Sequence, residues 1–234
     1  MSVVPLSHAD DLSRRWGHLD GLELLEVMIH HVFPGRIAVT SSFGAEAAVL
    51  LHLVAQVEPN TPVLFVDTDA LFDETIAYRE RLVRRLGLTD LRIARPSLAD
   101  LAASAELWSS DADACCRLRK VLPFERVTRG FAALIDGRKG FHGAGRSQLP
   151  VISVGAAGVV KISPLARWDE AELEAMYRDH NLPRHPLSAQ GYRSIGCWPC
   201  TRATQPGEPA RAGRWAGAAK TECGIHTFAG GDGI

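Results

Sequence analysis

The five cysteines of this 234-residue chain fall into groups that suggest two kinds of chemistry. Cys115 and Cys116 are adjacent, Cys197 and Cys200 form a C-W-P-C pair, and Cys223 stands alone in K-T-E-C-G-I-H. Four thiolates can hold zinc or an iron–sulfur cluster. The fifth is then a spare thiol that could react. The count therefore predicts a four-thiolate metal centre and one nucleophilic cysteine.

The spacing within the four-cysteine group bears on the metal. A structural zinc site normally uses two separated C-x-x-C-type pairs, whereas one half here is C-C with no spacer. Adjacent side chains diverge, so they chelate one small ion poorly but can reach different irons of a cluster. Spacing alone favours an iron–sulfur cluster and leaves zinc, or buried and redox-active cysteines, as alternatives.

The surroundings of Cys223 favour a reactive thiol. A lone cysteine is more often an inert apolar residue. This one lies in a polar, Gly-flanked stretch beside Lys220 and His226, and neighbouring cations increase the fraction of thiolate. A nucleophile is therefore the interpretation that its neighbours support.

A strand–loop–helix segment, T-S-S-F-G-A-E at 40–46, is a candidate anion site. Backbone amides at the start of a helix bind phosphate and sulfate groups. The segment lacks the Lys and the spacing of a Walker A loop, and the chain has no dinucleotide fingerprint. An ordinary strand–helix turn with Ser as N-cap is the alternative.

Basic residues could hold the anionic ligand of such a site. Arginine matches sulfate and phosphate oxygens with two parallel hydrogen bonds, although any single arginine can equally be solvated surface. The segment R-A-G-R-W at 211–215 is the most suggestive, because it is otherwise too polar to pack. The candidate set is Lys120, Lys139, Arg146, Arg202, Arg211 and Arg214.

Alternating apolar runs and helical patterns must position these residues. Strand, helix, strand, helix, strand at short spacing predicts right-handed crossovers and a parallel sheet of the α/β class. Ligands bind beyond the carboxyl ends of such strands, which puts the turns at 41–44 and 67–72 on one edge. We expect strands at 37–40, 63–66, 91–94, 131–136 and 159–162. We expect helices at 21–31, 45–56, 73–86 with Asp73 as N-cap, 98–105, 116–129 with an interruption at Pro123, and 169–180 capped by Asp169.

Composition excludes several other classes. The chain is 46% hydrophobic and 23% charged, so it can bury a sizeable core, and a net charge of −1 indicates no general nucleic-acid or membrane binding. No signal peptide or long apolar run is visible, so we expect a cytoplasmic protein, where thiols stay reduced. We expect one domain over 1–203 and a tail over 204–234 that carries Cys223.

Five motifs together resemble the assimilatory adenylyl-sulfate reductases of the phosphoadenylyl-sulfate reductase family. The resemblance covers 36–226, and its last three motifs are highly specific, whereas the first is shared with many adenine-nucleotide enzymes of the PP-loop type. The motifs are S-F-G-A-E at 42–46, C-C-R-L-R-K at 115–120, N-L-P-x-x-P-L-x-x-Q-G-Y-x-S-I-G-C-x-P-C-T-R at 181–202, R-A-G-R-W at 211–215 and K-T-E-C-G-I-H at 220–226.

The resemblance implies a doubly wound, adenine nucleotide alpha hydrolase-like domain with a mobile C-terminal tail. It implies that Cys115, Cys116, Cys197 and Cys200 ligate one 4Fe–4S cluster and that Cys223 is the nucleophile. The implied reaction is reduction of adenylyl sulfate to sulfite and AMP through an S-sulfocysteine, with thioredoxin or a similar dithiol as reductant, in sulfate assimilation and cysteine biosynthesis.

The resemblance also implies a substrate site. Lys120 would lie between cluster and substrate, and Ser42 and Gly44 would shape the nucleotide site. The sulfate and phosphate would be held by Arg146, Arg211 and Arg214.

The chain departs from the family pattern in two loops. Relatives usually have Gly and Pro where this chain has Asp69 and Asp73. In the loop before Arg146, three positions differ: Lys139 replaces an Arg, Gly140 a second Arg and His142 a Gln. Arg146 is therefore the better candidate ligand of that loop.

Three other functions compete with this one. The chain could act on the 3′-phosphorylated substrate, although relatives of that type typically keep only the final cysteine. It could be a PP-loop enzyme that uses ATP, or a non-catalytic iron–sulfur or zinc module that senses redox state. A homo-oligomer is compatible with each of these.

Overall fold

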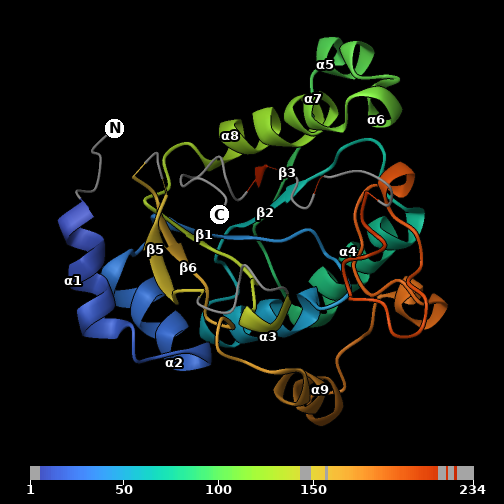
Figure 1. Cartoon of the computed structure of the whole chain (residues 1–234). Helices are drawn as coiled ribbons and strands as arrows, with labels where there is room; N and C mark the ends of the chain where they lie inside the picture. Colours follow the sequence, from blue (N-terminus) through green and yellow to red (C-terminus); the bar gives the residue numbers. More distant parts are fainter. Residues whose placement is uncertain (1–5, 143–148, 156–157, 216–219, 221–223, 226–234) are drawn as a thin grey trace.

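A six-stranded sheet in the order β3-β2-β1-β4-β6-β5 forms the centre of the molecule (Figure 1). The computed structural model describes residues 6–142, 149–155, 158–215, 220 and 224–225. All neighbouring strands are parallel except β5, which runs antiparallel to β6 at one edge. The strands are β1 (Ile37–Thr40), β2 (Val63–Val66), β3 (Leu91–Ala94), β4 (Ala133–Ile135), β5 (Ile152–Val154) and β6 (Val160–Ile162). The predicted parallel sheet and its five strands are confirmed, and β5 was missed.

Helices cover both faces of the sheet, with α8 on one side and α2 and α3 on the other (Figure 1). The helices are α1 (Leu6–Trp16), α2 (Gly21–Glu26), α3 (Ala47–Val57), α4 (Asp73–Leu86), α5 (Leu98–Ala103), α6 (Leu107–Ser110), α7 (Ala112–Cys116), α8 (Leu122–Thr128) and α9 (Glu170–Asp179). Two π-helical turns, η1 (Val27–Val32) and η2 (Arg117–Val121), and short 3₁₀ turns, including η3 (Gly140–His142), η5 (Pro186–Gln190) and η6 (Trp198–Cys200), complete the set.

Strand β1 shows why the sheet is buried on both faces. Successive strand side chains point to opposite sides. Ile37 and Val39 belong to the larger core with α2, α3 and α4, whereas Ala38 packs in a smaller core with Phe124 of α8. A four-residue strand that is apolar at every buried position is therefore the expected pattern for a central parallel strand.

The start of α4 differs in detail from the prediction. The helix begins at Asp73 as a helical residue, and Phe72 is the N-cap, without a side-chain hydrogen bond. Asp73 was thus wrongly predicted as the cap. It lies instead in the first turn with Glu74, where the helix dipole favours carboxylates.

A long helical segment runs without a break from α7 through η2 to α8. The predicted interruption at Pro123 is replaced by the π turn that directly precedes it. Proline has no N–H and its ring clashes with the carbonyl four residues earlier, and the wider π turn relieves both demands. Such turns are frequent at functional sites, and this one carries Arg119 and Lys120.

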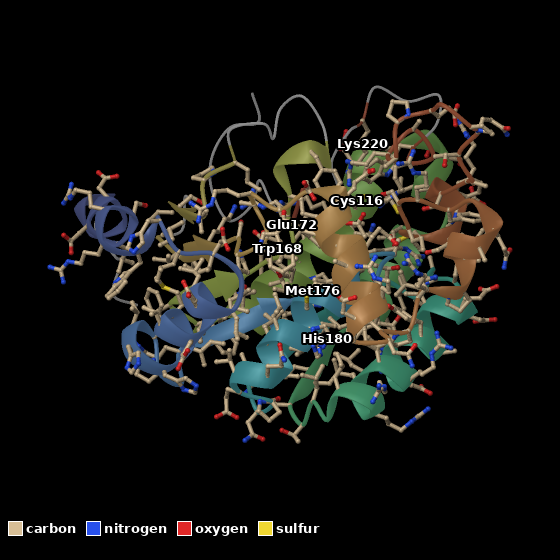
Figure 2. The ribbon with its side chains drawn as sticks, turned by 90° about the horizontal axis from the view of Figure 1, so that it is seen from below. Cys116, Trp168, Glu172, Met176, His180 and Lys220 are labelled. Carbon is tan, nitrogen blue, oxygen red and sulfur yellow. The ribbon has the colours of Figure 1, made fainter. Side chains whose placement is uncertain are left out.

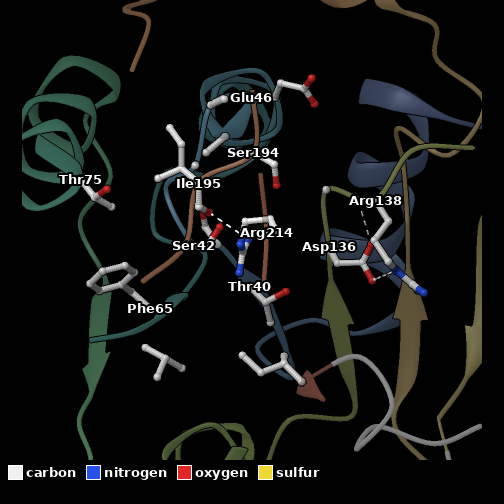
Figure 3. A pocket seen from close by; sticks show the side chains of 18 of the residues that line it. Thr40, Ser42, Glu46, Phe65, Thr75, Asp136, Arg138, Ser194, Ile195 and Arg214 are labelled. Carbon is white, nitrogen blue, oxygen red and sulfur yellow. Dashed lines mark hydrogen bonds and ion pairs between the residues drawn. The ribbon is translucent and has the colours of Figure 1, made fainter. Parts of the chain in front are cut away.

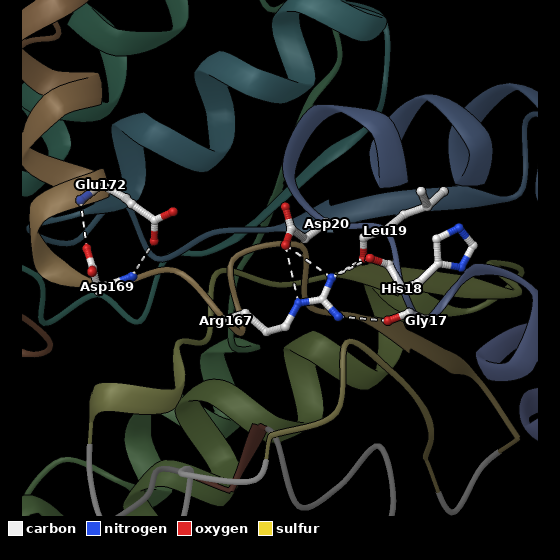
Figure 4. A network of polar contacts seen from close by, with 7 residues as sticks. All are labelled: Gly17, His18, Leu19, Asp20, Arg167, Asp169 and Glu172. Atoms are coloured by element: carbon white, nitrogen blue, oxygen red, sulfur yellow. Dashed lines mark hydrogen bonds and ion pairs between the residues drawn. The ribbon is translucent and has the colours of Figure 1, made fainter.

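Helix α9 is capped as predicted, with Asp169 and Glu172 forming a reciprocal capping box (Figure 4). Glu172, Met176 and His180 follow one another along its length (Figure 2). At its end the His180 ring lies 4.4 Å from the His52 ring, centroid to centroid. Helix α9 is thereby packed against α3.

Arg167 joins the chain after β6 to the connection between α1 and α2 (Figure 4). Its guanidinium pairs with Asp20 at 3.1 Å and donates to three backbone carbonyls at 2.8–2.9 Å. Those carbonyls belong to Gly17, His18 and Leu19. Within the described residues, no helix is both long and apolar enough to cross a bilayer.

Candidate active site

A cavity of about 280 Å³ opens at the carboxyl ends of β1, β2 and β4 (Figure 3). Ser42 and Gly44 line it from the turn after β1, and Thr68 from the turn after β2. Asp136 and Arg138 line it from the loop after β4. The cavity therefore lies at the edge of the sheet where the sequence predicts a ligand.

The turn after β1 is held in a strained shape. Phe43 has a positive φ of 48°, and its N–H donates to Ser41 Oγ at 3.1 Å. Its fully buried ring packs edge-on against Phe65, 5.4 Å away. A side chain at Gly44 would contact Ser42 Oγ at 3.4 Å. The turn thus fixes the backbone that faces the cavity.

Four of the predicted cations line this cavity: Lys120, Lys139, Arg211 and Arg214. Lys139 is buried, and its ammonium lies 2.6 Å from a Glu46 carboxylate oxygen.

Arg202, although in the predicted set, is paired elsewhere. Its guanidinium binds the Glu208 carboxylate at 2.9–3.0 Å outside the cavity lining. Arg146 lies outside the described residues.

The sequence did not single out an acidic–basic group beside β4. Buried Asp136 accepts from Arg138 and from the Ser163 hydroxyl, each at 2.8 Å. Burial lowers the pKa of nearby Lys161 to about 8, with Arg138 adding to this effect and Asp136 opposing it. The available signal was a charged residue directly after a buried strand.

The four clustered cysteines line a second cavity, of about 210 Å³. Cys115 and Cys116 come from the end of α7, and Cys197 and Cys200 from η6 and the residue before it. None of the four forms a disulfide, and Cys116 and Cys197 are buried. The structure thus brings together the residues that the sequence grouped.

Backbone hydrogen bonds hold the C-W-P-C turn from two sides. Trp198 N–H donates to Ala70 O at 2.9 Å, and Cys197 forms a β-bridge with Leu71, so one side is attached to the loop after β2. On the other side, Trp215 N–H donates to Cys200 O at 3.0 Å. The turn is therefore part of the wall between the two cavities.

The environment of Cys197 favours a thiolate. Burial alone would raise its pKa, but the Lys120 ammonium, the Thr68 hydroxyl and Arg214 together lower it. Burial raises the pKa of Cys115 and of Cys200.

The donor set is compatible with a metal cluster. The side chains of all four cysteines line one cavity. A cluster with four metal corners accepts thiolates that are set apart from one another. These four residues would therefore hold the iron–sulfur cluster that the sequence resemblance implies, and zinc stays an alternative.

Among the residues that the structure describes, Lys120 is the one that lines both cavities. It is buried, with 8% of its surface exposed, and lies in the π turn η2 directly after the adjacent cysteines. Its charge therefore acts on both sites at once.

Cys223 and His226 lie outside the described residues, but residues near Cys223 meet the site. Ile225 lines the first cavity. The Lys220 ammonium contacts Asp113 of α7 and lies 5.7 Å from the Trp215 ring centroid. Figure 2 shows Lys220 at the same end of the molecule as Cys116.

The comparisons with known proteins agree with this geometry. The family model for the phosphoadenosine phosphosulfate reductase domain matches residues 36–203. The chain belongs to this family. An adenosine 5′-phosphosulfate reductase from Mesorhizobium japonicum is 46% identical over 95% of this chain and 92% of the relative. One from Streptomyces coelicolor is 37% identical over 92% of this chain and 93% of the relative.

Solved structures agree at the level of the fold. A phosphoadenylyl-sulfate reductase from Candida auris, a phosphate complex, has a TM-score of 0.72 and 28% identity, covering 85% of this chain and 97% of that one. Yeast FAD synthetase has a TM-score of 0.55 at 16% identity, over 85% of this chain and 76% of its own. The predicted α/β fold is therefore confirmed.

Proposed function

We propose that the chain reduces adenylyl sulfate to sulfite and AMP in assimilatory sulfate reduction, as a step toward cysteine. The observation that carries this proposal is Lys120, shared by a cavity at the sheet edge and a cavity lined by four cysteines. The similar adenosine 5′-phosphosulfate reductases, at up to 46% identity, support the substrate. The activity is that of an oxidoreductase.

One 4Fe–4S cluster per chain would be held by Cys115, Cys116, Cys197 and Cys200. Its chemistry would be electrostatic and structural, since thiols supply both electrons. Four iron ions and four acid-labile sulfide ions per chain would support this assignment if variants of these four cysteines lose both. Zinc in its place would contradict it.

The first step is attack by the Cys223 thiolate on the sulfur of adenylyl sulfate. A sulfur–sulfur bond forms, the bond from sulfur to the bridging oxygen breaks, and AMP leaves with its electron pair. The product on the protein is an S-sulfocysteine, a covalent intermediate that divides one hard step into two.

The second step consumes a dithiol, which we propose to be thioredoxin. One thiolate attacks the Cys223 sulfur and sulfite leaves with the electron pair of the broken bond. The second thiol then resolves the mixed disulfide, which regenerates Cys223 and releases oxidised thioredoxin. The sulfur of the substrate gains two electrons and the dithiol loses two.

Cations are needed because an anionic thiolate approaches an anionic sulfate. Arg211 and Arg214 line the cavity with Lys120, and Arg146 would join them. Preorganised positive charge in a water-poor site lowers the barrier for this approach. The turn at Ser42 and Gly44 would receive the nucleotide.

The 3′-phosphorylated nucleotide is the second candidate substrate, because the Candida auris relative is named a phosphoadenylyl-sulfate reductase. Sulfite release should be measured with each nucleotide at equal concentration, with thioredoxin and its reductase. We expect adenylyl sulfate to give the higher kcat/KM. A preference for the 3′-phosphorylated form would overturn the substrate assignment, and no release with either would favour a non-catalytic module.

We also propose a cytoplasmic location, a main domain over 1–203 and a tail over 204–234 that brings Cys223 to the substrate. The described part of the tail supports this role, since Arg211 and Arg214 already line the cavity.

A further inference from the structure

The guanidinium of Arg214 lies directly against the backbone of Gly196. A Cβ atom added at Gly196 would stand 2.3 Å from one guanidinium nitrogen and 2.4 Å from its central carbon. Arg214 Nη1 also donates to Ile195 O at 3.4 Å (Figure 3). The guanidinium therefore occupies the space that any side chain at position 196 would fill.

Neighbouring residues hold Arg214 in that place. The Trp215 ring lies under the guanidinium, with 4.4 Å from Cζ to the ring centroid. Arg214 forms a β-bridge with Thr201, directly after Cys200. The chain approaches closely at Gly213 too, where a Cβ would stand 2.2 Å from Arg202 O. The position of the charge is thus set by the C-W-P-C turn and its partner segment.

Part of the guanidinium has no internal partner. Arg214 Nε is buried and makes no hydrogen bond among the described residues. Buried donors are nearly always satisfied, so an unmatched donor at a cavity wall indicates a ligand acceptor. Ile195, Gly196 and Arg214 all line the cavity at the sheet edge.

We propose that Gly196 is a positioning residue for the anionic end of the substrate. Because Gly196 has no side chain, the Arg214 guanidinium can pack directly against its backbone. The backbone at Gly196 therefore determines the position of this positive charge. This inference rests on the proposed function, because it takes the ligand to be a nucleotide carrying a sulfate group. It adds a structural link, since the same turn carries two of the four clustered cysteines.

The test is Gly196→Ala, a change that the backbone tolerates because Gly196 is not among the glycines with positive φ. The close contact is with the end of a flexible side chain, so Arg214 should move while the fold stays. Binding should be measured by calorimetry in a Cys223→Ser background, which prevents turnover. We expect adenylyl sulfate to bind about tenfold more weakly, the loss typical of one charge-assisted hydrogen bond. Binding of uncharged adenosine should not weaken. The visible absorbance of the proposed iron–sulfur cluster should also be retained.

Arg214→Ala and the double variant separate this inference from the proposed function. If Gly196 acts through Arg214, adding Gly196→Ala to Arg214→Ala should cost nothing further. Full additivity, or loss of adenosine binding, would overturn the positioning role. If Arg214→Ala itself leaves adenylyl sulfate binding unchanged, the ligand role of Arg214 fails, and the positioning role fails with it. Sulfite release by the parent chain would still test the proposed function separately.

Discussion

The hydroxyl of Thr68 lies 3.2 Å from Cys197 Sγ, so the turn after β2 reaches from the wall of one cavity to the wall of the other. Arg119 fixes this turn by donating to Thr68 O at 3.1 Å. Thr68 is buried, with 1% of its surface exposed. A hydrogen bond to a ligating sulfur is one of the means by which a protein tunes an iron–sulfur site.

Thr68→Val should weaken retention of the proposed iron–sulfur cluster. Valine has the same shape but no hydroxyl, so Cys197 loses this one hydrogen bond while packing is kept. We expect faster bleaching of the visible absorbance under a chelator than in the parent chain. Thr68→Ser keeps the hydroxyl and should bleach at the parent rate. Equal bleaching by the valine variant would show that this hydrogen bond does not support the site.

Lys120→Met should slow sulfite release while leaving the iron content of the proposed cluster unchanged. Methionine keeps the length of the side chain and removes the charge that both cavities share. Loss of one preorganised charge at a reacting centre typically costs about 10²-fold in rate. Lys120→Arg retains the charge and should recover part of the activity. An unchanged rate for the methionine variant would exclude Lys120 from the reaction.

Arg167→Ala should destabilise the joint between the N-terminal helices and the sheet. Three backbone carbonyls and Asp20 lose their common donor. Because the side chain is 43% exposed, we expect a modest loss of about 1–2 kcal/mol in the free energy of unfolding, measured by urea denaturation. The control is Arg178→Ala, which removes only an exposed pair with Asp179 and should change little.

The fold should become less stable as the pH falls, because His185 is buried as a neutral ring. Its ring is buried, accepts from Leu187 N–H through Nδ1, and therefore donates from Nε2 to Thr75 Oγ1, 3.0 Å away. Burial lowers its pKa from 6.5 to about 4, with Glu74 opposing and Arg81 adding to the effect.

Between pH 4 and pH 6.5, His185 thus stays neutral in the folded state but takes up a proton in the unfolded state. The contribution of His185 to the free energy of unfolding is fully present above pH 6.5. It is lost as the pH falls toward 4, and the loss is at most about 3 kcal/mol. Denaturation at several pH values should show this slope. His185→Asn retains a capping side chain and should flatten it. An unchanged slope would assign the acid sensitivity to other groups.

Much of this architecture could be predicted because it depends on local pattern. The strands β1 and β2 are short apolar runs bounded by polar turns, and the residue limits of β1, β2 and β3 agree with those expected. Strand β5 has only three residues, and its pairing with β6 at the sheet edge depends on a long-range contact. No local pattern of that length distinguishes a strand from a loop.

In the site too, some features could be predicted from local sequence and others depend on long-range contacts. The four cysteines were grouped correctly, because thiols at these spacings have few structural uses in one chain. The partners of polar side chains were not foreseeable: Arg202 was expected near the ligand and binds Glu208 instead. The contacts of Thr68 with Cys197 and of Arg214 with Gly196 join distant segments, and only the fold brings them together.

In the proposed reaction, Cys223 carries the sulfonate between the two steps. The most direct measurement is mass spectrometry of the intact chain after incubation with adenylyl sulfate in the absence of any reductant. We predict one sulfonate per chain, mapped to Cys223 by peptide analysis, one equivalent of AMP, and sulfite release when thioredoxin is added. The Cys223→Ser variant should show none of these. Sulfite release by that variant, or a sulfonate on another cysteine, would contradict the account.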